Sequence, residues 1–269
     1  MNNFRNPQRS RRFIAHISML GTTHLHLRNP YMIMCWSLAF PGFGHLLLNK
    51  YLRGYALVIW EMFINQRIHL NEAMVLSFNG RFEAARDALD PKLMYLYIPV
   101  YLFAIWDSYR TTVDLNKVYL LASRERSPFN IFTLGAFEIN YLDKRKPWLA
   151  AVWSMGIPSV GQLYLHRLVL AGFILVYTVI LVWNSNLLLS LHYLIVGDLA
   201  ASKSVVNAQW LLYFPSFYWF VVYDAYSNTV SNNKLFDTEL KLFLKENFQP
   251  AGRTIIVGEK ITDANLRNV

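Results

Sequence analysis

The residues that could do chemistry fall into two short sets of similar composition. The first set combines one imidazole, two basic groups and one carboxylate: His45, Lys50, Arg53 and Asp107. The second set combines one amide, one basic group and one carboxylate: Gln162, Arg167 and Asp224. Charged groups within apolar sequence require partners, so ion pairs that close a helical hairpin are one interpretation. A site for an anionic ligand, such as a lipid headgroup, is the other.

Glu61 is a third candidate, because it is an acid in the middle of an apolar stretch. Acids in such positions are functional candidates by default. The alternative is that Glu61 faces Gln66 or His69 near the end of the same stretch. One acid alone does not predict a proton relay.

The histidines His16, His24 and His26 lie close together in the sequence. They are not accompanied by the cysteines or carboxylates that a zinc or haem site needs, so we expect no metal and no cofactor. The chain also has no serine nucleophile elbow, no phosphate-binding glycine loop and no H-E-x-x-H motif. The sequence therefore predicts no catalytic residue.

The composition favours a membrane protein. Of 269 residues, 54% are hydrophobic and 16% are charged, whereas soluble domains are about 25% charged. The uncharged run Leu168–Leu191 is long enough to span hydrocarbon. The net charge of +9 fits either cytoplasmic loops or a nucleic-acid surface. The basic residues lie between apolar stretches, which favours the loops and argues against nucleic acid. Cys35, inside an apolar stretch, is expected to be a small core residue.

An internal repeat relates the two halves of the chain. The sequence WSLAFPGFGHLLLNK from Trp36 matches WSMGIPSVGQLYLHR from Trp153 at one constant offset. The sequences WDSYRTTVDLNK and YDAYSNTVSNNK match at that same offset. Apolar bias alone cannot align this polar series, so the pattern indicates a tandem duplication. The residues expected to shape each unit are Trp36, Pro41, Gly44 and Gly54, then Trp153, Pro158, Gly161 and, one residue out of register, Gly172.

The predicted fold is an all-α integral membrane protein of tandem duplicated helical hairpins. It has about four full crossings and two short Pro/Gly-broken interfacial or re-entrant segments. The predicted parts are a basic cytoplasmic N-terminal segment (1–30), membrane repeat 1 (31–118), a cytoplasmic linker (119–147), membrane repeat 2 (148–234) and a cytoplasmic amphipathic tail (235–269). Excess Lys and Arg before the first span, in the linker and in the tail predicts that both termini are cytoplasmic. The expected location is the bacterial cytoplasmic membrane.

Three local features refine this prediction. Asp90 followed by Pro91 is a helix start signal, with Asp as the N-cap. The connection 66–92 has one apolar helical face, which places it on the outer membrane surface. The tail carries a similar stripe, suited either to the inner membrane surface or to packing on the protein itself: Phe236, Leu240, Phe243 and Leu244.

The repeated motif P-x-x-G-H-x-x-x-x-K-x-x-x-G, followed by a helix that ends in I-W-D, resembles the two-transmembrane domain family. In the first unit the match is carried by Pro41, Gly44, His45, Lys50, Gly54 and Asp107. In the second unit it is carried by Pro158, Gly161, Gln162, Tyr164, Arg167, Gly172 and Asp224. The resemblance implies two tandem membrane modules. It implies an architecture and no particular chemical activity.

Three functions stay open. The first is a non-catalytic multi-pass protein, a scaffold or accessory subunit that meets a membrane-protein partner through the linker 119–147 or the tail 235–269. The second is a small transporter or lipid-handling protein, and the third is a lipid-modifying membrane enzyme. Transport predicts a polar cavity between the units, and an enzyme predicts acids and histidines in one cleft. A scaffold predicts an exposed apolar or aromatic face.

Overall fold

The computed structural model describes residues 12–125 and 131–248, and the protein is mostly helical, as predicted. The first half contains β1 (Ala15–Ser18), β2 (Gly21–His24), α1 (Pro30–Ala39), α2 (Phe43–Leu47), α3 (Tyr51–Ile68), α4 (Leu70–Phe78), α5 (Phe82–Ala88) and α6 (Pro91–Glu125). The second half contains β3 (Phe132–Leu134), β4 (Ile139–Tyr141), α7 (Pro147–Gly156), α8 (Val160–Tyr164), α9 (Leu168–Ser185), α10 (Leu187–Val196), α11 (Leu199–Val205), α12 (Ala208–Leu211) and α13 (Tyr213–Phe248).

The elements of the two halves correspond in order and closely in length, apart from the short α12, which has no counterpart in the first half. Helices α1 and α7 both have 10 residues, and α3 and α9 both have 18. The tertiary hydrogen bonds correspond as well: the Asn116 side chain accepts from the backbone N–H of Arg28 at 3.0 Å, and Asn233 accepts from Arg145 at 2.9 Å. The correspondence includes the strands, since each half opens with an antiparallel hairpin, β1–β2 or β3–β4.

Each half folds its Pro/Gly segment into two short helices joined by a sharp turn. Gly42 has φ of 100° and Ser159, in the same place of the second half, has φ of 99°. A 10-residue helix such as α1 is only about 15 Å long, which is too short to span hydrocarbon. The segment leaves from Arg28 and returns at Asn49, and both residues join one polar cluster around Asp224. The α1–α2 segment therefore enters the bundle and turns back to the same end.

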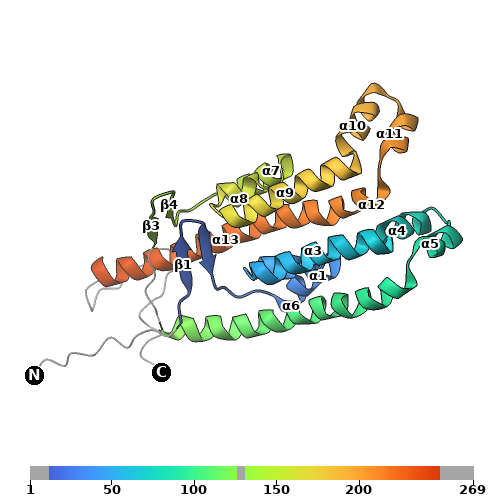
Figure 1. Ribbon diagram of the computed structural model, residues 1–269. Coiled ribbons are helices and arrows are strands. Elements are labelled where there is room, and N and C mark those ends of the chain that lie inside the picture. Colours follow the sequence, from blue (N-terminus) through green and yellow to red (C-terminus); the bar gives the residue numbers. More distant parts are fainter. Residues whose placement is uncertain (1–11, 126–130, 249–269) are drawn as a thin grey trace, which may run out of the picture.

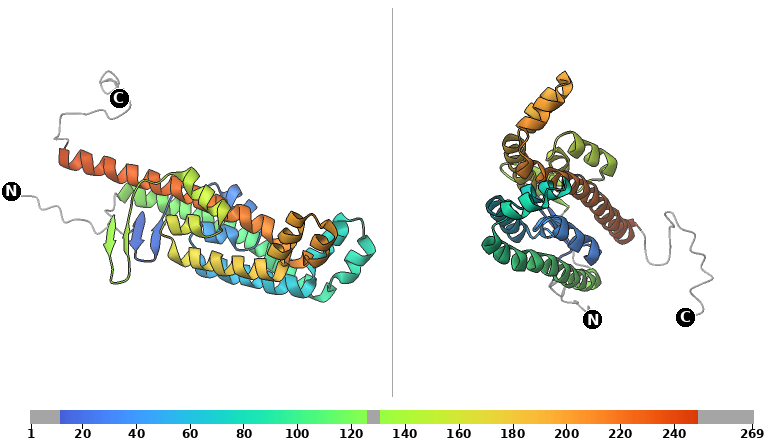
Figure 2. Two further views of the ribbon diagram at one scale, coloured as in Figure 1. Left: turned by 90° about the horizontal axis from the view of Figure 1, so that it is seen from above. Right: turned by 90° about the vertical axis from the view of Figure 1, so that its right-hand side faces the viewer.

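Four long helices, α3, α6, α9 and α13, form the body of the molecule (Figure 1). The hairpins lie at one end, and α4, α5, α10 and α11 lie at the other (Figures 1 and 2). Helices α6 and α13 have 35 and 36 residues, so each is about 50 Å long. They extend beside the hairpins, past the beginnings of α3 and α9.

The core between the halves is aromatic. Phe43 from the first half stacks on Phe220 from the second half, with ring centroids 4.1 Å apart. Phe40 meets Tyr177 and Tyr213 edge-on at 6.5 and 5.9 Å. These rings are nearly inaccessible to solvent, so the middle of the interface is closely packed.

One helix, α9, is long and apolar enough to cross a membrane by itself. Helices α5 and α6 pass the same test together, although they meet at 85°, so the described chain has one candidate span, or two if that bent pair is one span. Helix α3 has the same length as α9 but includes Arg53, Glu61 and Arg67. Only a third of the apolar window in α9 is buried, whereas the core helix of a soluble protein is mostly buried.

Several finer predictions need correction. The hairpin β1–β2 lies in the predicted N-terminal segment, and β3–β4 lies in the predicted linker. The alternation of apolar and polar residues near Gly21 and Gly135 is the signal for them. Helix α9 ends at Ser185 instead of continuing to Leu191, because Asn186 adopts φ of 53°. Cys35 is exposed and is not a core residue.

The connection 66–92 is two helices, α4 and α5, separated by Gly80 with φ of 74°. The tail does not form a helix of its own, since α13 continues to Phe248, and the predictions for 1–11, 126–130 and 249–269 lie outside the described residues. The predicted start of α6 is confirmed, because it begins at Pro91 and the Asp90 carboxylate accepts from the N–H of Lys92 at 2.9 Å.

The structure separates the roles of the repeat glycines. A Cβ on Gly44 or Gly161 would collide with the serine hydroxyl and a carbonyl of the preceding helix, and a Cβ on Gly54 would collide with Leu46. A Cβ on Gly172 would meet no atom within 4 Å. Gly172 is therefore not a close-packing glycine, although the sequence pattern pairs it with Gly54.

We expect Gly161→Ala to destabilise the protein by about 1–3 kcal/mol, because overpacking forces the α7–α8 turn apart. The matched control Gly172→Ala should be neutral or stabilising by about 0.5–1 kcal/mol, since Ala favours the helix. Thermal unfolding in detergent measures both. Equal melting temperatures for the two variants would contradict the assigned roles.

Candidate functional site

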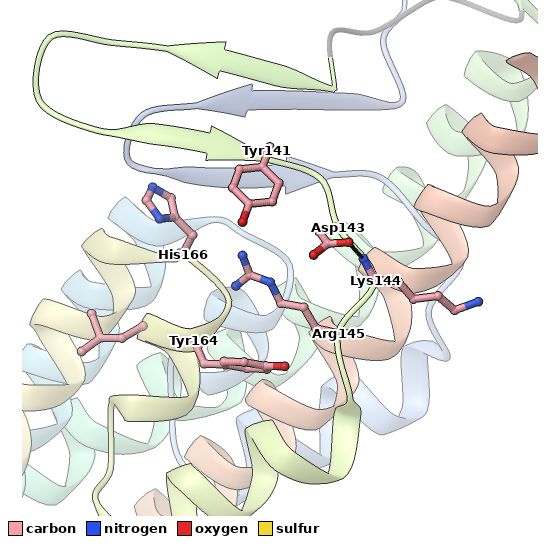
Figure 3. Close-up of a pocket in the computed structure, with 7 residues that line it drawn as sticks. Tyr141, Asp143, Lys144, Arg145, Tyr164 and His166 are labelled. Carbon is pink, nitrogen blue, oxygen red and sulfur yellow. Dashed lines mark hydrogen bonds between the residues drawn. The ribbon is translucent and has the colours of Figure 1, made fainter.

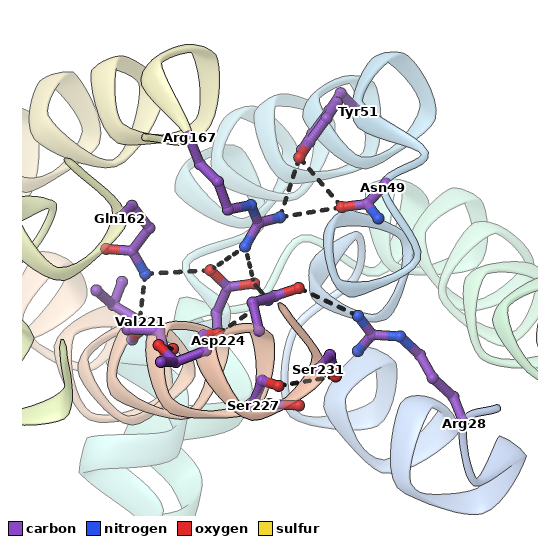
Figure 4. A network of polar contacts seen from close by, with 12 residues as sticks. Arg28, Asn49, Tyr51, Gln162, Arg167, Val221, Asp224, Ser227 and Ser231 are labelled. Carbon is purple, nitrogen blue, oxygen red and sulfur yellow. Dashed lines mark hydrogen bonds and ion pairs between the residues drawn. The ribbon is translucent and has the colours of Figure 1, made fainter. Parts of the chain in front are cut away.

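The second-half set forms one buried cluster (Figure 4). Arg167 Nη1 donates to both Asp224 oxygens, at 2.9 and 2.7 Å. Gln162 Nε2 donates to the same carboxylate at 3.1 Å and to the Val221 carbonyl at 2.9 Å. Arg167 and Asp224 are almost fully inaccessible to solvent. The three predicted residues are thus brought together by α8, α9 and α13.

The first-half set is brought together only in part. Asp107 lies 2.9 Å from His45 Nε2 and accepts from Arg53 Nη1 at 2.6 Å. His45 is buried, but the Arg53 side chain is half exposed. Lys50 is the exposed N-cap residue of α3 and does not join this cluster in the described part of the chain. In the repeat, Arg167 corresponds to Lys50. The arginine that pairs with Asp107 is Arg53, which lies about one helical turn after that position.

Residues from the first half complete the second-half cluster. Arg167 Nη2 donates to Asn49 Oδ1 and to the Tyr51 hydroxyl, each at 3.0 Å. Asn228 Nδ2 donates to Asp224 Oδ1 at 2.8 Å, and Asn228 Oδ1 accepts from Arg28 Nη2 at 3.3 Å. Figure 4 shows Arg28 and Arg167 approaching Asp224 from different sides.

Sequence analysis missed Arg28, Asn49, Tyr51 and Asn228 as members of this cluster. The spacing of Asp224 and Asn228 by one helical turn is a signal that could have found one of them. The others come from distant parts of the chain, and no local pattern marks them.

Glu61 belongs to a second polar cluster at the opposite end of the bundle. Its Oε1 accepts from Asn65 Nδ2 at 3.1 Å and from the Tyr97 hydroxyl at 3.3 Å, so the alternative partners Gln66 and His69 are wrong. Gln209 Nε2, from the second half, donates to Asn65 Oδ1 at 2.9 Å. Asn71 Nδ2 donates to the Gln209 carbonyl at 2.9 Å. These amide contacts join the two halves.

Two of the clustered histidines line a cavity of about 740 Å³ at the hairpin end. It lies between the β2–α1 connection, α6 and α13, and Arg28 and Lys234 also line it. The rings of His24 and His26 stack with centroids 4.8 Å apart. Burial, followed by the charge of Arg28, lowers the pKa of His24 to about 3 and that of His26 to about 2. Both imidazoles are therefore neutral at pH 7.

A smaller, polar pocket of about 380 Å³ lies below the β3–β4 hairpin (Figure 3). Its lining includes Asp143, Arg145 and His166. The Arg145 guanidinium lies 5.3 Å from the centroid of the Tyr164 ring, and His166 Nε2 lies 2.9 Å from the carbonyl of Met19. Within residues 12–125 and 131–248, no group of three or more His, Cys, Asp or Glu residues is arranged to hold a metal ion.

Comparison of the chain with protein-family models, with curated proteins and with solved structures found no match. The geometry of the three polar clusters and of the two cavities is thus the basis for any functional assignment. The tandem two-transmembrane resemblance remains a prediction.

Removing Asp224 should cost far more stability than removing Asp107. We expect Asp224→Asn to destabilise the protein by about 3–5 kcal/mol, because it leaves Arg167 as a buried unpaired charge. Asp107→Asn leaves Arg53 half exposed to solvent, and its cost should be about 1–2 kcal/mol. Thermal unfolding of the purified variants compares them. A cost for Asp107→Asn equal to or above that for Asp224→Asn would refute this ranking.

Acid should destabilise the protein through His24. Its folded pKa of about 3 lies below the ordinary value of 6.5, so between these values the unfolded chain binds a proton that the folded chain excludes. Stability therefore falls as pH drops from 7 to 5, on the order of 1–2 kcal/mol for this residue. His24→Gln should reduce the loss of melting temperature across this range, and the exposed control His192→Gln should not. An unchanged acid response in His24→Gln would exclude His24 as its source.

Proposed function

We propose that the chain is a non-catalytic multi-pass membrane protein that acts as an accessory subunit or scaffold of a membrane assembly. In this proposal α3, α6, α9 and α13 cross the membrane, and the α1–α2 and α7–α8 segments are re-entrant. The apolar surface supports it. Large side chains on the outside of the bundle are widely exposed, among them Phe63, Trp106, Val176, Trp183 and Trp219. A water-exposed surface of this kind would aggregate, whereas lipid covers it.

The charges support an orientation with the hairpin end in the cytoplasm. Basic residues gather there in the segments next to the hairpins, namely Arg12, Arg28 and the run Lys144–Lys146, and on the far ends of α6 and α13. At the opposite end the two connections 66–92 and 193–209 hold five basic residues and five acidic ones. An excess of Lys and Arg is typical of the cytoplasmic side.

The observation that carries the scaffold proposal is the uncovered helix α10. It has the sequence LLLSLHYLIV, and none of its residues is buried. With α11 it projects from the bundle, as Figure 2 shows in the right-hand view. Its counterpart α4 instead buries Asn71 and Ala73 and packs on α12. An apolar helix that its own chain leaves open, at the level of the outer leaflet, suits contact with another membrane protein.

The alternatives have less support. A transporter needs a polar path between the units, but stacked aromatic rings such as Phe43 and Phe220 fill the middle of that interface. An enzyme needs acids and histidines in one open cleft. His45 and Asp107 do meet, but His45 is fully buried and Asp107 nearly so. The pocket below β3–β4 contains Asp143 and His166, but His166 Nε2 lies against the Met19 carbonyl. Lipid handling keeps one favourable observation, the cavity at the hairpin end.

Site-specific photocrosslinking in intact membranes tests the scaffold proposal. A photoreactive amino acid at Ile195, which is 85% exposed on α10, should give a discrete adduct with one protein. The same label at Val176, which is exposed on the lipid-facing side of α9, is the control and should give lipid adducts only. Mass spectrometry of the gently extracted protein identifies the adduct.

Either of two results would overturn the proposal. Lipid adducts alone at both positions would show that α10 has no protein partner. Release of the chain from membranes by alkaline carbonate, without detergent, would show that it does not span the bilayer.

A further inference from the structure

The cavity at the hairpin end is lined by a cation, Arg28, that pairs directly with no carboxylate of residues 12–125 and 131–248. Arg28 and Arg167 both lie close to Asp224, but the carboxylate is bound by Arg167 at 2.7 and 2.9 Å. Arg28 makes a 3.3 Å hydrogen bond to the neutral Asn228 amide. No ion pair between Arg28 and a carboxylate occurs within the described residues. Two guanidinium groups thus share one carboxylate, which leaves a net positive charge beside the cavity.

The histidines beside Arg28 supply further unused polar atoms. His24 is 5% exposed, and neither ring nitrogen has a hydrogen-bond partner in the part of the chain that the structure describes. His26 uses Nε2 with the Ser231 hydroxyl at 3.1 Å, while its buried Nδ1 has no partner there. A buried polar atom without a partner costs free energy. A neutral imidazole carries one N–H donor, which suits an anionic oxygen.

The rest of the cavity is different in character. Away from Arg28 its wall mixes aliphatic side chains with tyrosines and a few hydroxyl groups. Toward the middle of the bundle the lining includes Met32 and Ile33 from α1 and Tyr223 and Tyr226 from α13. Lys234 on α13 is exposed and also lines it. The volume of about 740 Å³ is far larger than a phosphate ion needs and lies in the range of small-molecule sites. One end of the cavity thus suits an anion, and the other suits a hydrocarbon chain.

We propose that this cavity binds one anionic phospholipid, with its phosphate beside Arg28 and His24 and an acyl chain that runs toward the bilayer past Met32 and Tyr226. The choice of a lipid rests on the proposed membrane location, which places this cavity at the cytoplasmic headgroup level. Lys234 at the edge is positioned for the outer part of the headgroup. The site does not use the Arg53–Asp107 pair. Asn228 links Arg28 to the Arg167–Asp224 pair, but that carboxylate is bound directly by Arg167 and not by Arg28.

The test is native mass spectrometry of the full chain, purified in mild detergent and depleted of lipid. The probes are dihexanoyl phosphatidylglycerol, dihexanoyl phosphatidylcholine and inorganic phosphate. Wild type should bind one phosphatidylglycerol and prefer it over phosphatidylcholine. Arg28→Gln should weaken this binding about tenfold or more, because it removes a charge-assisted contact. Lys234→Gln should weaken it several-fold by removing an exposed cation near the headgroup.

The matched control is Lys117→Gln, which removes one positive charge from an exposed position on α6 without touching the cavity. It should bind phosphatidylglycerol as wild type does. Asn116 holds the backbone of Arg28 at both its N–H and its carbonyl, at 3.0 and 2.8 Å, so Arg28→Gln should fold. The melting temperature of Arg28→Gln shows whether this variant folds. If it does not fold, the exposed Lys234→Gln variant decides the test.

Equal binding of phosphatidylglycerol by wild type, Arg28→Gln and Lys234→Gln would overturn the proposal, and so would equal affinity for the two lipids. Inorganic phosphate that binds as tightly as the lipid and displaces it would overturn the lipid assignment in favour of a free phosphate. Carbonate extraction separates this proposal from the membrane proposal. A chain released by carbonate that still binds phosphate through Arg28 has an anion site without a membrane span.

Discussion

The buried pair of Arg167 and Asp224 is the constraint on which the arrangement of the two halves depends. Neither charge has access to water, and a buried charge is tolerated only when it is paired and hydrogen-bonded. Gln162 and Asn228 satisfy the carboxylate from within the second half. The two Nη2 donors are satisfied by Asn49 and Tyr51 of the first half, while Nε has no partner among the described residues. The pair therefore fixes α9 against α13 and also fixes where α3 begins.

The corresponding pair of the first half, Arg53 and Asp107, connects only elements of its own half. Asp107 binds His45 and Arg53, and the half-exposed Arg53 side chain contacts no residue of the second half through a hydrogen bond among those described. The corresponding carboxylates Asp224 and Asp107 thus form one central and one peripheral ion pair. This asymmetry follows from the position of the arginine, since Arg167 precedes α9 and points inward, whereas Arg53 lies one turn into α3.

The sequence was sufficient to predict what depends on local pattern. The polar series that ends each unit identified Asp107 and Asp224, and the Pro/Gly turns identified the broken segments. It was insufficient where contacts are long-range: Arg28 and Asn228 are 200 residues apart. It also misjudged the end of α9, because the run stays uncharged through the polar triplet Asn184–Asn186 although the backbone at Asn186 is left-handed. Asn tolerates that conformation better than most residues, and the apolar run Leu168–Leu191 concealed the break.

The two polar clusters also explain how the halves could hold together in the proposed membrane setting. Lipid removes the hydrophobic drive for helix association, so packing and hydrogen bonds between helices must supply specificity. The bundle has an ionic cluster around Asp224 at one end and an amide cluster around Asn65 and Gln209 at the other, with stacked rings between. The amides of the cluster around Gln209 carry no net charge and cost little to bury once their hydrogen bonds are made, and Glu61 joins this cluster through its hydrogen bond with Asn65. The ionic cluster retains the extra charge of Arg28, which is tolerable only near headgroups or solvent. The excess positive charge therefore lies at one end of the bundle only. This makes the two ends chemically different, which the repeat alone does not.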